Sequence, residues 1–136
     1  AQVGRYPDDA SLWRVSGTIK NPAGTLVLHL VGNLFHYVGG ALGGSGYVRD
    51  RDAEFAERGL SRDDLLGRIH ACHEQVVTVL GGVSDDVMAA PYPGVLPPSM
   101  AGATTHRFLL HLSGHFMWHL GQVDYHRRIV VERAQP

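Results

Sequence analysis

Cysteine is nearly absent from this chain, and neither sign of charge dominates it. Cys72 is the only cysteine among 136 residues, so the chain cannot form an internal disulfide, and such cysteine usage suits a reducing compartment. Twelve basic side chains stand against thirteen acidic ones, which leaves a formal net charge of -1. The sequence has no basic stripe of the kind that a nucleic-acid backbone requires, so nucleic acid is not an expected partner.

Long apolar runs are missing as well. No uninterrupted apolar run reaches the roughly 18–20 residues that a membrane span needs. The opening residues, AQVGRYPDD, lack the charged and then apolar layout of a secretion signal. Apolar residues make up 44% of the chain and charged residues 18%, as in ordinary globular proteins. We therefore expect a soluble, cytoplasmic protein with a single domain over residues 1–136 and no membrane partner.

Helical periodicity is the main structural signal in the sequence. Three long segments and one short segment carry it, at about residues 21–38, 61–80, 105–132 and 8–15. The connections over about 43–59 and 83–103 are too long for tight turns, and such connections usually cross over a bundle or line a site. No segment alternates in the manner of a β-strand. The expected fold class is all-α.

Residues that favour helix ends bound the long segments. Asn21 is expected to cap the first, with Pro22 at the first helical position, where its missing N–H costs nothing. Ser61 is expected to cap the second, and either Thr104 or Thr105 the third. The glycines at 39–40 and 43–44 are expected to end the first helix, and those at 81–82 the second.

A ridge of histidines marks the third long helix, in the stretch HLSGHFMWHLGQVDYHRR. His111, His115 and His119 are spaced four apart and share one face, which Gln122 and His126 continue. Buried imidazoles stacked in this way cannot all bond to one another, whereas a divalent metal can bind several of them. A pair at i and i+4, here HFMWH, is the geometry that HExxH sites use, but the glutamate of a zinc protease is missing.

A tight metal site needs at least one more ligand, and the first long helix supplies two candidates. His29 and His36 lie seven residues apart on one face, and the leucines beside His29 favour its burial. His70 and His73 on the second long helix are weaker candidates, and His106, at a helix start, is expected on the surface. The alternative interpretation is that all of these imidazoles are core or surface side chains that bind no metal.

Three segments in this order give the sequence a resemblance to a known family. LVLHLVGNL, YVRDRDAEF and HFMWHLGQVDYHRR are similar to segments of the DinB-like family, which comprises damage-inducible and related bacterial proteins. The resemblance covers about residues 21–128. It implies an up-down-down-up four-helix bundle with long crossover loops and a metal bound by three histidines. On this match the metal ligands are His29, His115 and His119. Because little sequence precedes the DDASLW segment, the first helix of the bundle is expected to be short or missing from the given chain.

The resemblance also implies a function. Three neutral imidazoles leave open positions around a divalent metal, zinc or nickel by preference, that can activate water or a thiol. We therefore expect a metal-dependent enzyme acting on a small molecule, either a thiol transferase that uses a low-molecular-weight thiol or a hydrolase. The alternatives are a non-catalytic, metal-stabilised dimerisation or stress-response domain and a metal-free interaction domain. A chain without its first helix would expose an apolar groove, which favours a homodimer.

Two further side chains are candidates to orient the ligand imidazoles. Gln122 lies one turn beyond His119, and Glu74 lies in the middle of the second long helix. For Glu74 a solvated helix face is the competing interpretation, and for Gln122 a contact between helices. The charged run RDRDAEF is expected to be a solvated loop, with a latch over the site as the alternative.

Overall fold

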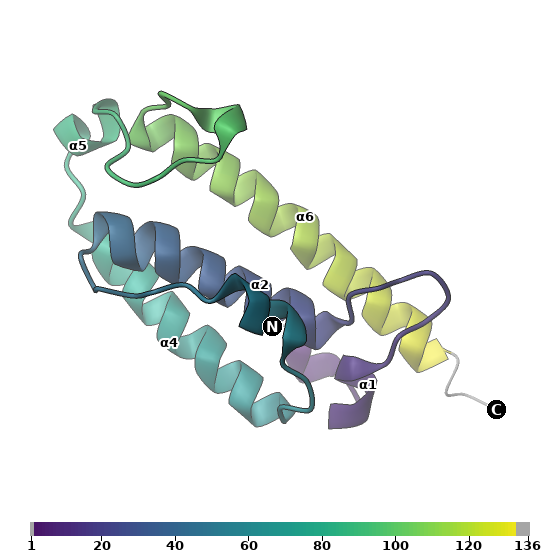
Figure 1. Cartoon of the computed structure of the whole chain (residues 1–136). Coiled ribbons are helices and arrows are strands. Elements are labelled where there is room, and N and C mark those ends of the chain that lie inside the picture. The colour runs from purple at the N-terminus through teal and green to yellow at the C-terminus, as the bar shows by residue number, and fades with distance from the viewer. Residues whose placement is uncertain (1, 133–136) are drawn as a thin grey trace.

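The protein is all-α, as predicted. The computed structural model describes residues 2–132, and within that range it contains helices and no strand. Three helical rods form the body of the molecule (Figure 1). They are α2 (Ala23–Leu34), continued by the π-helix η2 (Phe35–Leu42), α4 (Arg62–Gly81) and α6 (Thr105–Glu132). The shorter elements are η1 (Val3–Arg5), α1 (Asp9–Trp13), α3 (Arg51–Ala56), α5 (Asp85–Ala89) and η3 (Pro98–Met100).

The first rod departs from the sequence prediction at its start and agrees with it in part at its end. Pro22, with φ -67° and ψ 166°, is extended and takes the cap position, so the helix begins at Ala23 and Asn21 does not cap it. Of the glycines expected to end the rod, those at 39–40 lie inside the π-helix, whereas Gly43 is its C-cap, as predicted. The backbone changes to a left-handed conformation at Gly44, whose φ is 63°, and a side chain at this position would disfavour that conformation.

The caps of the other two rods follow the sequence more closely. Ser61 and Asp64 form a reciprocal capping box at the start of α4. Thr104, rather than Thr105, caps α6 by accepting a hydrogen bond from the backbone N–H of Arg107. Satisfying the free N–H groups of the first turn stabilises each helix by about 1 kcal/mol.

The rod formed by α2 and η2 is the centre of the fold. It packs against α4 on one side and α6 on the other (Figure 1), while α3 also covers α2. The 20 residues of Ala23–Leu42 are long and apolar enough to cross a membrane by length and composition alone. However, 61% of the most apolar window is buried inside the fold, as in the central helix of a helical bundle. The burial of this rod places His29 in the interior, facing α6.

His126 and Tyr6 join the N-terminal segment to α6. The imidazole of His126 is 2% exposed. Its Nε2 lies 2.8 Å from the backbone carbonyl of Arg14, to which Nε2–H donates, and its Nδ1 lies 2.8 Å from the hydroxyl of Tyr6. His126, which continues the histidine ridge beyond Gln122, therefore has a structural role in joining the N-terminal segment to α6.

Replacing His126 with glutamine is expected to make stability less dependent on pH. Burial lowers the pKa of His126 below its ordinary value, so the unfolded chain binds this proton more readily than the folded chain. Its contribution to stability is full above about pH 6.5 and is lost as the pH falls toward the lowered pKa. Urea titrations of the metal-free proteins at several pH values measure how steeply the free energy of unfolding changes with pH. An equal pH dependence in the two proteins contradicts the prediction.

Candidate metal centre

Three histidines from two rods converge at the middle of the fold. His29 comes from α2, and His115 and His119 come from successive turns of α6. One ligand nitrogen from each lies within 4.8 Å of the other two. The ring centroids are 5.2, 5.1 and 4.6 Å apart, so the three imidazoles form a nearly equilateral group. His29 is buried and the other two are half-buried, which leaves the group open on one side.

Hydrogen-bond partners behind two of the rings set their tautomers. Nδ1 of His29 lies 3.0 Å from Oε2 of Glu54, and Nδ1 of His119 lies 2.7 Å from Oε1 of Gln122. Both oxygens only accept hydrogen bonds, so in each neutral ring Nδ1 carries the proton and donates it. The Nε2 of each ring therefore presents a lone pair to the centre of the group.

His115 cannot donate a hydrogen bond to both His29 and His119. Its Nε2 lies 3.3 Å from Nε2 of His29 and 3.2 Å from Nε2 of His119. A neutral imidazole has a single N–H and can donate to only one of them, while the other lone pair stays unpaired. Its own Nδ1 is buried and, among the described residues, has no hydrogen-bond partner. A divalent cation resolves the conflict at the centre because it accepts one lone pair from each ring, so the three histidines can hold a metal ion.

Burial keeps His29 and His115 in the neutral form that binds metal. Burial, the largest cause, and the neighbouring imidazoles together lower the pKa of His115 to about 4. Burial also lowers the pKa of His29, although the Glu54 carboxylate acts in the opposite direction. Near neutral pH both nitrogens are therefore available as ligands without the loss of a proton.

Glu54 holds His29 from behind, and Arg49 holds Glu54. The carboxylate accepts hydrogen bonds from Nε of Arg49 at 2.6 Å and from its Nη2 at 2.8 Å, while Oε2 also accepts from His29. Only 6% of the Glu54 side chain is exposed. This carboxylate–imidazole pair is the usual means of fixing the orientation of a ligand histidine. Both residues lie in the run RDRDAEF, so this run is not only a solvated loop: residues 50–53 are exposed, but Arg49 and Glu54 form a buried arginine–carboxylate pair, as in the alternative expectation.

Glu74, one of the two residues expected to orient a ligand, lies elsewhere. Its side chain is 66% exposed on α4, and its carboxylate faces Nδ1 of His73 at 3.7 Å. Glu74 therefore lies on the exposed side of α4, whereas Leu65 and Cys72 lie on its buried side. Gln122, the other candidate, does contact His119. Glu54 instead has the role that was expected of Glu74, that of orienting a ligand imidazole. Its only signal in the sequence was that it is an acidic residue within the YVRDRDAEF segment.

Gly32 makes room for the Glu54 carboxylate. A Cβ built at Gly32 would overlap Oε1 of Glu54, so any side chain at this position displaces the acid from His29. Gly32→Ala is expected to lower the free energy of unfolding by about 1–3 kcal/mol through overpacking, and to weaken metal binding as well. Chemical denaturation and metal titration measure the two effects.

Gly67→Ala is the matched control for this substitution. Gly67 also lies within a helix, but a Cβ there meets nothing within 4 Å. Alanine is therefore expected to raise stability by up to about 1 kcal/mol and to leave metal binding unchanged. If both alanine variants bind metal as the unmodified protein does, Glu54 does not need the space at Gly32.

The other histidines of the described residues lie outside the three-histidine group. His111 is exposed one turn before His115, and His36 is half-buried beside Tyr37. The remaining exposed histidines are His70, His73 and His106. Cys72 is buried, and burial raises the pKa of its thiol to about 11, so it is not a ready nucleophile or ligand.

Comparisons with known proteins do not assign the chain to a family. No family model matches it, and neither a curated protein nor a solved structure matches it. The group of three histidines in an all-helical chain agrees with the resemblance to the DinB-like family. Membership of that family stays a prediction.

Proposed function

We propose that this chain is a metal-dependent enzyme of the DinB-like type that acts on a small molecule in the cytoplasm. Its three imidazoles would hold a divalent cation, zinc or nickel by preference, for thiol transfer or hydrolysis. The observation that carries the proposal is the convergence of two lone-pair Nε2 atoms on His115, whose single N–H cannot serve both. This arrangement is costly without a cation and stable with one.

Three features of the chain support chemistry over a purely structural site. Among the described residues, the group has three possible ligands, whereas closed structural sites have four. All three ligands are neutral, so a bound divalent cation keeps its full charge and lowers the pKa of a coordinated water or thiol. Glu54 and Gln122 hold two of the rings in fixed orientations, as a reactive site requires.

A second candidate function follows from an apolar groove between α4 and α6. This groove has a volume of about 560 Å³, and apolar side chains such as Leu30, Val76 and Phe116 line it. Exposed grooves of this kind are typical of association surfaces, so they favour a homodimer in which the metal serves only to tie α2 to α6.

Cobalt substitution tests the proposed function. Cobalt(II) reports its coordination in the visible spectrum, and a thiol that binds to it adds a charge-transfer band in the near ultraviolet. We expect one cobalt per chain and a new band when 2-mercaptoethanol is added. A spectrum that thiols and other small ligands leave unchanged indicates a closed, structural site. No cobalt bound at all excludes both candidate functions and leaves a metal-free helical domain.

A further inference from the structure

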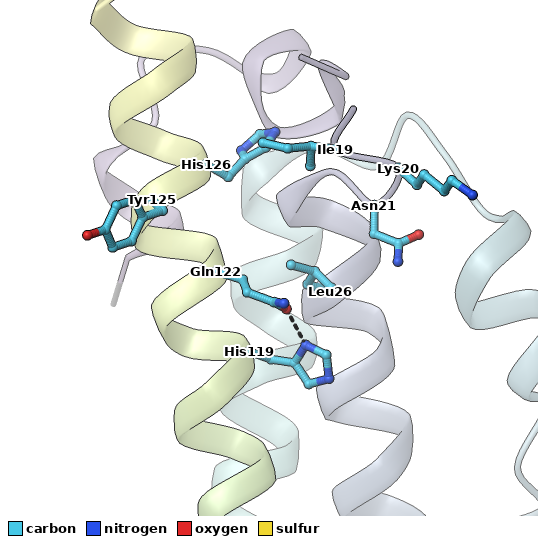
Figure 2. A pocket seen from close by; sticks show the side chains of 8 residues that line it. All are labelled: Ile19, Lys20, Asn21, Leu26, His119, Gln122, Tyr125 and His126. Atoms are coloured by element: carbon cyan, nitrogen blue, oxygen red, sulfur yellow. Dashed lines mark hydrogen bonds between the residues drawn. The ribbon is translucent and has the colours of Figure 1, made fainter. Parts of the chain in front are cut away.

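A second cavity lies against the metal centre, on the side of His119 toward the start of α2. Its volume is about 350 Å³. One wall is formed by α6, which contributes His119, Gln122 and Tyr125, and the other by the segment before α2, which contributes Lys20 and Asn21 (Figure 2). Because His119 belongs both to this cavity and to the three-histidine group, a molecule held at the centre can extend into the cavity.

The polar groups of this cavity are mostly hydrogen-bond donors. Oε1 of Gln122 accepts from His119, so the two N–H groups of the same amide remain available (Figure 2). His126, at the upper end, has both nitrogens committed to Tyr6 and Arg14. The amide of Asn21, at the rim, offers both a donor and an acceptor. A ligand that fits this cavity must therefore supply an acceptor for the amide N–H groups of Gln122.

Lys20 gives the cavity its charge. It is the only lysine in the chain, and the cavity lining contains no aspartate or glutamate. Figure 2 shows its side chain extended from the rim into solvent. Among the described residues its ammonium group has no hydrogen-bond or ion-pair partner, so the flexible stem is free to fold over the mouth.

We propose that this cavity binds the carboxylate of a small substrate, with Lys20 and the amide of Gln122 as its partners. The inference rests on the proposed function, because the reacting end of the same molecule is taken to lie at the three histidines. One ammonium group and neutral amide donors match a single negative charge. The apolar side chains of Ile19 and Leu26 accommodate the carbon chain between the two ends. A volume near 350 Å³ is at the small end of ligand sites, which limits the substrate to a small organic acid.

Thiols with and without a carboxylate test this assignment on the cobalt-loaded full-length protein. The probes are a series from 3-mercaptopropionate to 6-mercaptohexanoate and the matching mercaptoalcohols, and their dissociation constants come from the charge-transfer band. For each chain length, the dissociation constant of the alcohol is divided by that of the acid, and the same ratio is measured for cobalt in solution. At the best chain length we expect the ratio for the protein to be about three- to tenfold larger than the ratio in solution. Lys20→Met is expected to abolish this preference, and Lys20→Arg to keep it.

Arg107→Met serves as the matched control, since it removes one positive charge from an exposed position near the start of α6. It is expected to keep the preference for the acid. If the thiols bind without any preference for the acid, or if Lys20→Met keeps that preference, the carboxylate site is overturned while the metal centre stands. If the protein binds neither cobalt nor any thiol, the proposed function fails and this inference fails with it.

Discussion

Replacing His119 with alanine is expected to abolish metal binding at physiological metal concentrations. The substitution removes one of three ligands and also frees Gln122 from its hydrogen bond. Loss of a group that only supports a ligand weakens metal sites by about 10–100-fold, so loss of the ligand itself should exceed about 100-fold. His29→Ala and His115→Ala are expected to have the same effect. Elemental analysis of protein purified without an affinity metal, followed by competition with a chelator, measures it.

Stability provides an independent measure of the same effect. Zinc at about 1,000 times its dissociation constant should raise the free energy of unfolding of the unmodified protein by about 4 kcal/mol, and the alanine variants should lose this gain. His111→Ala is the matched control, because His111 is exposed on the same face of α6 and lies outside the group. Retained zinc in all three ligand variants would show that the ion binds elsewhere. Loss of zinc in the His111 variant would show that the site is wider than three residues.

The all-α class, the three rods and the caps of α4 and α6 could be predicted because they depend on local signals. The capping box at Ser61 and the helical spacing of the histidines are set by residues three or four apart. The π-helix could not be predicted in this way. Within it Gly39 packs against Gln75 of α4, where a Cβ would overlap the amide, and nothing near Gly39 in the sequence indicates this contact.

The histidine ridge shows the same division between local and long-range information. The spacing of His115 and His119 was enough to place both rings on one face of a helix. The approach of His29 depends on the packing of α2 against α6. For this third ligand the sequence offered two candidates, His29 and His36, and the family resemblance selected His29. Glu54 comes from a short helix, α3, inside a connection expected to be solvated. Its burial depends on the absence of a side chain at Gly32, which a linear pattern does not reveal.

Glu54→Gln is expected to weaken both the metal centre and the fold. Glutamine keeps the shape of the side chain but removes the charge that holds the Nδ1–H of His29 and the guanidinium of Arg49. Metal affinity should fall by about 10–100-fold because the ring of His29 loses its fixed orientation and part of its basicity. The free energy of unfolding of the metal-free protein should fall by on the order of 3 kcal/mol, since Arg49 is left with an unpaired charge and only 13% of its side chain exposed.

Glu57→Gln separates these effects from a general loss of negative charge. Glu57 lies three residues further along the chain and pairs with Arg68 at 3.0 Å, but both side chains are more than a third exposed. Such pairs contribute at most about 1 kcal/mol, so stability should change little and metal affinity not at all. A Glu54 variant that binds zinc as tightly as the Glu57 variant would mean that His29 is oriented by the packing of α2 alone. Glu54 would then serve only to neutralise Arg49, and the loss of stability would be seen without the loss of metal.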